Sequence, residues 1–208
     1  ENTIVISPGA NADVSVDFAL QALEKLQAGD LLLCQLEIPM ETVEAAIETA
    51  HRRRITTVLD PAPASCLPDS LLDSIDILTP NQTEAAILIG ASEPPREMAE
   101  AEQCAQELRR RGAHTVIVTM GNQGCLIVDG TVSTAVPGFQ VQVSDTTAAG
   151  DTFNGALAAA LAQEVPLAGA AVFANAAAAL SVTKPGALSS IPAASDVNKF
   201  LDSVEVTS

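Results

Sequence analysis

The chain has 208 residues, of which 48% are apolar and five are aromatic, and its formal net charge is −16. This length and apolar content predict one packed domain, residues 1–208, and exclude a disordered chain. The negative charge repels a phosphate backbone, and few rings are available for base stacking, so no nucleic-acid partner is expected.

Other classes of protein are disfavoured by what the sequence lacks. No apolar stretch is long enough to cross a bilayer and no signal peptide is found at Glu1, so no membrane partner is expected. The four cysteines are scattered, which predicts reduced thiols, no zinc site and a cytoplasmic location. A P-loop, a Gly-x-Gly-x-x-Gly turn and a recognisable hydrolase triad are also missing.

Apolar runs and amphipathic segments alternate along the chain. The predicted strands are 3–7, 30–36, 56–59, 76–79, 114–119, 124–128 and 131–136, with a strand-like run at 139–143. The predicted helices are 15–27, 39–54, 83–89, 96–111, 152–163, 167–181 and 195–203. The last two strands before the run at 139–143 form a predicted hairpin around Asp129-Gly130. This order predicts an α/β fold with a mostly parallel central sheet flanked by helices on both faces.

Polar residues and a glycine follow four of the predicted strands, namely Glu37, Asp60, Asn81 and Gly121. Ligands of open α/β sheets bind at the carboxyl ends of the strands, so we expect one shared crevice there.

The most informative segment is Asp145-Thr-Thr-Ala-Ala-Gly-Asp151-Thr-Phe-Asn-Gly155, which leads into an alanine-rich helix. The small residues Ala148, Ala149 and Gly150 let a ligand approach their N–H groups, and a helix N-terminus favours an anion. This pattern predicts an anion hole for a phosphoryl group, with Asp151 beside it as a candidate base for a hydroxyl nucleophile. A simple capping role for the aspartate is the alternative.

Three other segments allow both a structural and a functional interpretation. Asn81 and Glu84 form a predicted capping box, and the same pair can position Mg²⁺ beside nucleotide phosphates. The segment 119–124 is a tight turn whose glycines let the backbone approach a ligand. Asn175 lies among alanines in a helix, where a buried amide needs a hydrogen-bond partner.

These segments together resemble the ribokinase family, the phosphofructokinase-B-type carbohydrate kinases. The resemblance covers essentially the whole chain and rests on the segments Ser7-Pro-Gly-Ala-Asn11, Gln35-Leu-Glu37, Asp60-Pro-Ala-Pro-Ala64, Asn81-Gln-Thr-Glu84, Thr119-Met-Gly-Asn-Gln-Gly124 and Asp145–Gly155. It implies ATP-dependent phosphorylation of a small sugar, with D-ribose as the expected acceptor and D-ribose 5-phosphate as the product. Deoxyribose, fructose or a nucleoside as acceptor, or a nucleotide-binding fragment without catalysis, are the alternatives.

The resemblance also assigns roles to individual residues. It implies that Asp151 is the catalytic base, that Glu37 and Asp151 contact the sugar, and that Asn81 and Glu84 hold Mg²⁺ indirectly. The implied ATP-binding residues are Asn81, Thr119, Met120, Gly121, Asn122, Gln123, Gly124, Gly150, Asp151 and Asn175. The implied K⁺ ligands are carbonyl oxygens and one carboxylate, and they come from Asp145, Thr147, Ser181, Lys184, Gly186 and Ser190.

The family's N-terminal third has no counterpart in this sequence. That third supplies a small β-sheet lid, the dimer contact and further sugar contacts in the family. The chain is therefore expected to be the carboxyl two-thirds of such a kinase, and a homodimer is expected only of a full-length family member.

Overall fold

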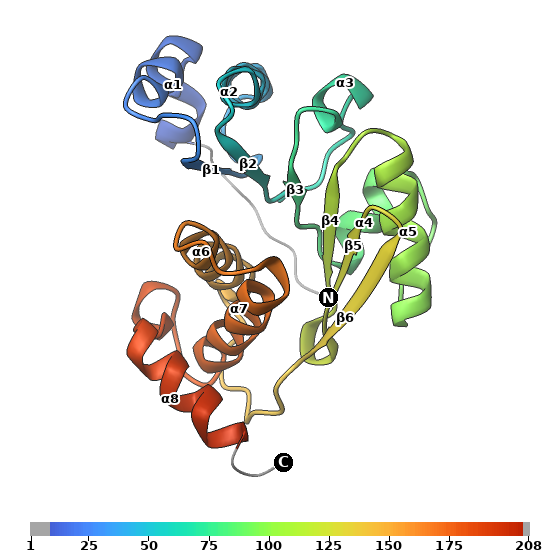
Figure 1. Ribbon diagram of the computed structural model, residues 1–208, viewed down its shortest axis with the longest axis vertical. Helices are drawn as coiled ribbons and strands as arrows, with labels where there is room; N and C mark the ends of the chain where they lie inside the picture. The colour runs from blue at the N-terminus through green and yellow to red at the C-terminus, as the bar shows by residue number, and fades with distance from the viewer. Residues whose placement is uncertain (1–8, 206–208) are drawn as a thin grey trace.

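The computed structural model describes residues 9–205 of the chain. A single six-stranded sheet lies between two layers of helices (Figure 1). The strands are β1 (Leu31–Cys34), β2 (Thr56–Leu59), β3 (Ile77–Leu78), β4 (Thr115–Thr119), β5 (Gly124–Asp129) and β6 (Val132–Pro137). The helices are α1 (Val16–Leu23), α2 (Met40–Arg52), α3 (Asp69–Leu72), α4 (Gln82–Ile89), α5 (Met98–Arg110), α6 (Ala149–Leu161), α7 (Leu167–Ser181) and α8 (Ala194–Glu205).

The strands lie side by side in chain order, and β1 to β4 are parallel. The sheet ends in the antiparallel hairpin β5–β6, which turns at Gly130 with a φ of 57°. Both the mostly parallel sheet and the hairpin around Asp129-Gly130 agree with the prediction. Among residues 9–205, no helix combines the length and apolar character that a bilayer span needs.

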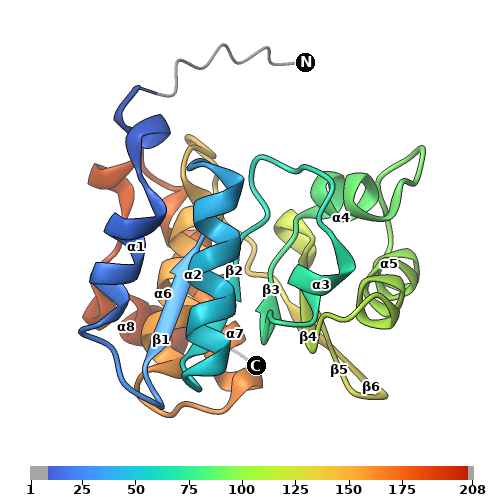
Figure 2. The same cartoon turned by 90° about the horizontal axis from the view of Figure 1, so that it is seen from above.

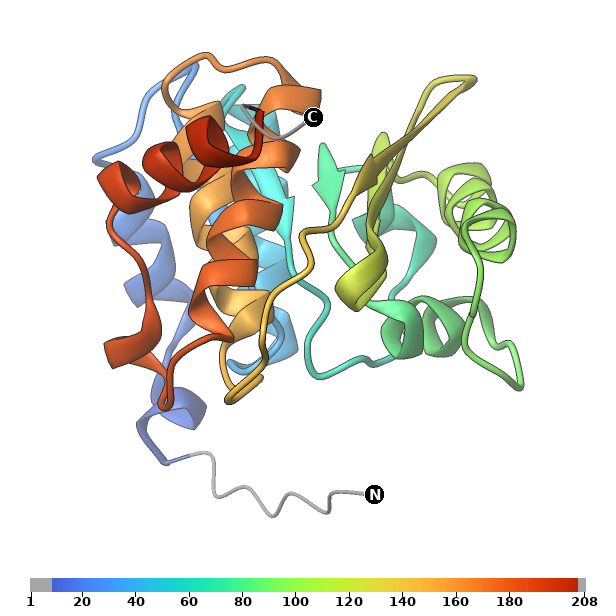
Figure 3. The same ribbon diagram turned by 90° about the horizontal axis from the view of Figure 1, so that it is seen from below.

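Alternating side chains of the strands build a core on each face of the sheet. Val116 and Val118 of β4 pack on one face with buried residues of α2, α3, α4 and α5. Figure 2 shows these four helices from above. Ile117, between them, packs on the other face against Phe153 and Leu157 of α6. Figure 3 shows α6, α7 and α8 from this second side, in orange to red. The period of two along a strand therefore fixes which helices each residue meets.

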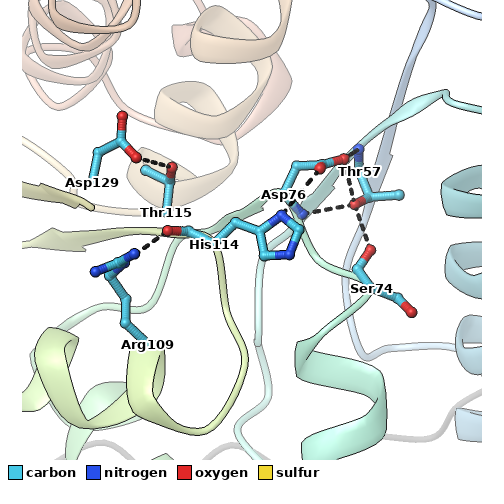
Figure 4. A network of polar contacts seen from close by, with 7 residues as sticks. All are labelled: Thr57, Ser74, Asp76, Arg109, His114, Thr115 and Asp129. Atoms are coloured by element: carbon cyan, nitrogen blue, oxygen red, sulfur yellow. Dashed lines mark hydrogen bonds and ion pairs between the residues drawn. The ribbon is translucent and has the colours of Figure 1, made fainter.

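A polar network secures the amino ends of the parallel strands (Figure 4). Asp76 Oδ2 accepts from the Thr57 N–H at 2.7 Å and from the Thr57 hydroxyl at 3.0 Å, and His114 Nδ1 lies 3.6 Å from Asp76 Oδ1. Because these groups lie at the edge opposite the predicted crevice and bond one another, they join β2, β3 and β4 rather than face a ligand.

Two predicted strands have a different outcome. The strand at 3–7 lies outside the described residues. The prediction of a strand-like run at 139–143 is wrong, because these residues form an irregular connection after β6. Its apolar alternation has another cause. The Phe139 ring packs edge-on against Phe200 of α8, with ring centroids 5.2 Å apart, as the chain leaves the sheet for the helical layer.

Candidate active site

The segments that follow β1 to β4 meet at one edge of the sheet. The Asp60 N–H donates to the Cys34 carbonyl at 2.9 Å, and the Leu36 N–H donates to the Ala62 carbonyl at 2.9 Å. The Thr119 N–H donates to the Pro80 carbonyl at 2.9 Å, which places the start of the 119–124 loop beside Asn81. The backbone therefore brings the segments carrying Glu37, Asp60, Asn81 and Gly121 together, as a parallel sheet requires.

Helix α6 begins at Ala149, three residues before the predicted start at 152. Its N-cap, Ala148, has a left-handed backbone with a φ of 59°, and no side chain caps the helix. The Ala149 N–H makes a long bond of 3.3 Å to the Thr146 carbonyl. The N–H groups of Gly150 and Asp151 have no hydrogen-bond partner among the described residues, and a Cβ at Gly150 would meet nothing within 4 Å. This turn therefore presents open donors to an anion.

Asp151 is exposed in the first turn of α6, beside these donors. It also borders a hollow of about 240 Å³ between α6, α7 and the segment leading into α8, lined mainly by small apolar residues such as Ala156 and Ala177. A larger hollow of about 580 Å³ lies between the 89–96 segment and α5 and contains none of the predicted site residues. The chemistry-bearing residues therefore lie at an open edge of the sheet rather than in this larger hollow.

Asp145 joins the signature to the turn after α7. Its Oδ1 accepts from the Thr147 N–H at 2.9 Å and from the Thr147 hydroxyl at 2.6 Å, and its Oδ2 accepts from the Gly186 N–H at 2.9 Å. The Thr147 hydroxyl, the Gly186 amide and the Thr147 amide together lower the pKa of Asp145 to about 2. The carboxylate is therefore ionised at neutral pH, next to two loops rich in backbone carbonyls.

The other predicted K⁺ ligands lie on the second of these loops. Ser181 ends α7 and its carbonyl accepts from the Lys184 N–H at 3.2 Å, while Ser190 closes the short 3₁₀ helix Leu188–Ser190. The Ser144 N–H donates to the Val182 carbonyl at 2.7 Å, which ties the two loops together. Within residues 9–205 no group of three His, Cys, Asp or Glu side chains could hold a metal ion. The available donors are mainly carbonyls with one carboxylate.

Asn81 and Glu84 form the predicted capping box at the start of α4. The Glu84 N–H donates to Asn81 Oδ1 at 2.9 Å, and the Asn81 N–H donates to Glu84 Oε2 at 2.8 Å. Burial raises the pKa of Glu84, although its bonds with Asn81 act in the opposite direction. The structural interpretation is therefore confirmed, and the capping box fixes both side chains at the carboxyl edge.

The 119–124 loop contains the 3₁₀ helix Gly121–Gln123. The side chain of Met120 is buried in the core on the α5 side, so only its backbone is near the loop surface. Gly124 has a φ of 96°, and a Cβ there would lie 2.1 Å from the Val136 carbonyl oxygen. Gly124 therefore serves close packing against β6, whereas Gly121, Asn122 and Gln123 are exposed.

Asn175 is buried in α7 and bonds the sheet. Its Nδ2 donates to the Val136 carbonyl at 3.3 Å and to the Pro137 carbonyl at 3.4 Å. Its amide nitrogen is thus engaged by β6, which agrees with the structural interpretation of a buried amide that finds partners.

Asp60 is a residue to which the sequence assigned a place but no role. It lies just after β2, and its Oδ2 accepts from Asn154 Nδ2 at 2.8 Å. Burial is the main cause that raises the pKa of Asp60 to about 7, and the negative charges of Glu84 and, to a smaller extent, Asp151 raise it further. The hydrogen bond from Asn154 acts in the opposite direction. The sequence indicated that Asp60 lies at the end of a strand and hence near the site. It gave no sign of the bond to Asn154, because the two residues are 94 positions apart.

The profile of the pfkB family of carbohydrate kinases matches residues 1–194. The chain belongs to this family. It is 43% identical over 202 residues to the ribokinase of Haemophilus influenzae, a match that covers 97% of this chain and 65% of that protein. It is 36% identical over 201 residues to the deoxyribokinase of Salmonella typhi, covering 96% of this chain and 65% of that relative.

The fold agrees with the family. The structure of Arabidopsis thaliana ribokinase in complex with ribose and ATP is similar, with a TM-score of 0.85 and 32% sequence identity. That match covers 97% of this chain and 65% of the Arabidopsis chain. The chain therefore spans about 65% of the length of each of these three relatives.

Proposed function

We propose that the native polypeptide containing this chain is an ATP-dependent sugar kinase that converts D-ribose to D-ribose 5-phosphate. The observation that carries the proposal is the first turn of α6, where the exposed Asp151 lies beside the open N–H groups of Gly150 and Asp151. The identity to a ribokinase and the fold shared with a ribokinase that binds ribose and ATP support this assignment.

In this proposal, Asp151 takes the proton from the primary hydroxyl of the sugar as its oxygen attacks the γ-phosphorus of ATP. The oxygen–phosphorus bond to the sugar forms while the bond to the ADP oxygen breaks, and ADP leaves. The N–H groups of Gly150 and Asp151 would stabilise the charge on the transferring group, because they are unpaired within residues 9–205 at the N-terminus of α6, where a helix favours an anion. Glu37, exposed after β1, contacts the sugar.

Two cations complete the proposed site. When bound, Mg²⁺ would neutralise the negative charge of the phosphates. Asn81 and Glu84 would hold it through water, because only Oε2 of Glu84 takes part in the capping box, where it accepts from the Asn81 N–H. K⁺ would be held by Asp145, Thr147, Ser181, Lys184, Gly186 and Ser190. The donor chemistry fits, because the two hydrogen-bonded loops offer carbonyls and one ionised carboxylate.

The nucleotide would lie along the exposed residues Gly121, Asn122 and Gln123. Their loop starts beside Asn81, so an ATP molecule there would have its phosphates near the proposed Mg²⁺ position. The identity to a deoxyribokinase supports deoxyribose as a second candidate acceptor.

The proposal is tested by ADP release from the native polypeptide with Mg-ATP and K⁺. The acceptors compared are ribose, deoxyribose, fructose, adenosine and none. Ribose-dependent release is expected, and Asp151→Asn should lower kcat by about 10²- to 10⁴-fold, the usual contribution of a general base, while ATP affinity changes little. Asp202→Asn, an exposed aspartate on α8, is the matched control. ATP binding without acceptor-dependent release would instead indicate a nucleotide-binding protein without catalysis.

A further inference from the structure

The turn after β2 is fixed to the segment that carries Glu37. The Asp60 N–H donates to the Cys34 carbonyl at the end of β1, and the Ala62 carbonyl accepts from the Leu36 N–H, both at 2.9 Å. Leu36 immediately precedes Glu37, the proposed sugar contact. The backbone around Asp60 therefore has a defined position relative to the sugar side of the site.

The side chain of Asp60 reaches the helix that carries the proposed base. Asn154 is 5% exposed, and its Nδ2 donates to Asp60 Oδ2 at 2.8 Å. Its Oδ1 has no hydrogen-bond partner among the described residues, so Asp60 is the acceptor that holds this amide. Asn154 follows Asp151 by three positions, and residues with this spacing share one side of a helix. The bond to Asp60 therefore fixes the side of α6 on which Asp151 lies.

The surroundings of Asp60 make a carboxylate costly there. The charged groups that influence it are two further carboxylates, Glu84 of α4 and Asp151 of α6. The Asn154 amide and the Ala62 backbone amide are the groups that favour its ionised form. Burial and both neighbouring charges oppose the ionised form of Asp60. The hydrogen bonds that Asp60 accepts are therefore the interactions that favour a carboxylate at this position.

We propose that Asp60 is a positioning residue for phosphoryl transfer, which holds the first turn of α6 and Asp151 in place relative to Glu37 through Asn154. The proposal rests on the proposed function of the same site. It adds a connection between the sugar side and the base, two parts of the site that lie on segments far apart in the sequence. A displacement of about 1 Å between reacting groups can lower a rate about 10²-fold, so such a connection is kinetically important.

The kinetic test uses the native polypeptide and four variants. Asp60→Ala and Asn154→Ala remove the bond, whereas Asp60→Asn keeps an oxygen that can accept from Asn154. Ser65→Ala is the matched control, since it removes an unpaired buried hydroxyl from the same loop. We expect Asp60→Ala and Asn154→Ala to lower kcat about 10- to 100-fold with the KM for ATP nearly unchanged. Asp60→Asn should recover most of this loss, and Ser65→Ala should have no effect.

A second measurement does not depend on activity. Amide hydrogen exchange of residues 152–157 should be at least tenfold faster in Asp60→Ala and Asn154→Ala than in the unmodified protein, with β2 and β4 unchanged. Asp60→Asn and Ser65→Ala should exchange at the original rate. Faster exchange throughout the domain with kcat unchanged would mean a purely structural role and would overturn the proposal, as would unchanged kcat and unchanged exchange.

The two measurements also separate the positioning role from the proposed reaction. If no acceptor is phosphorylated by the unmodified protein, the proposed function fails, while local exchange in α6 still decides whether Asp60 holds this helix. If ribose is phosphorylated and Asp60→Ala retains full kcat, the proposed function stands and the positioning role is wrong.

Discussion

The carboxylate of Asp145 accepts a hydrogen bond from the Gly186 N–H at 2.9 Å, across 41 residues of sequence. The same carboxylate holds the Thr147 amide and hydroxyl, so one side chain orders both the start of the signature and the turn after α7. The helix that begins at Ala149 follows directly, which connects the proposed cation loops to the proposed anion hole.

Replacement of Asp145 should weaken the response to K⁺. In Asp145→Asn the charge is lost, and an amide cannot accept from both Thr147 and Gly186 with the same geometry. We expect the K⁺ concentration for half-maximal sugar phosphorylation to rise at least tenfold, measured by ADP release at fixed ionic strength. Asp73→Asn, an exposed aspartate outside the proposed site, is the control. An identical K⁺ response, or full activity in Li⁺, would contradict the proposed cation site.

The charge of Asp60 should make stability depend on pH. Its pKa is about 7 in the folded protein and near 4 in a free aspartate, so the folded state binds more protons between these values. The contribution of Asp60 is therefore most favourable below pH 4, falls as the pH rises to 7 and stays low above that. Asp60→Asn removes this term and should gain stability relative to the unmodified protein, on the order of 1 kcal/mol at pH 8.

Urea unfolding at pH 4.5 and pH 8 would measure this difference. The relative gain of Asp60→Asn should be larger at pH 8 than at pH 4.5. Parallel changes of both proteins with pH would show that Asp60 titrates in its ordinary range.

The close packing of Gly124 should make it intolerant of a side chain. In Gly124→Ala the new Cβ would meet the Val136 carbonyl oxygen at 2.1 Å and the Gly138 nitrogen at 2.4 Å, both of them backbone atoms. We expect a loss of about 2 to 4 kcal/mol in the free energy of unfolding, from backbone displacement and strain. Gly130→Ala is the matched control, because Gly130 also has a positive φ but a Cβ there meets nothing within 4 Å. Equal losses would mean that φ alone sets the cost.

The four thiols should differ in reactivity. Burial raises the pKa of Cys34 to about 11 and, despite the bond from Asn175, that of Cys125 to about 12, and it is the main cause that raises the pKa of Cys104. Cys66 is exposed, so it should be the thiol that iodoacetamide modifies at pH 8 in the folded protein. Peptide mass mapping would identify the modified site, and rapid modification of Cys125 before unfolding would contradict the packing of β5.

Much of the fold could be predicted from local patterns. The parallel direction of β1 to β4 follows from apolar strands that alternate with helices along the chain. The capping box of Asn81 and Glu84 follows from their spacing of three residues. The run at 139–143 shows where such patterns fail. Phe139, Val141 and Val143 alternate like a strand, yet Phe139 packs on α8 and the run does not pair with the sheet.

Residue patterns alone predicted the α/β class, the gathering of Glu37, Asp60 and Asn81 at strand ends, and the signature around Asp151. These features depend on residue types and short spacings, which the local chain geometry converts directly into structure. Two contacts of the site could not be predicted in this way: Asn175 donates to the Val136 carbonyl of β6, and Asp60 accepts from Asn154, 94 residues away. Such contacts depend on how helices dock on the sheet, and the docking is set by packing over both faces rather than by any segment alone.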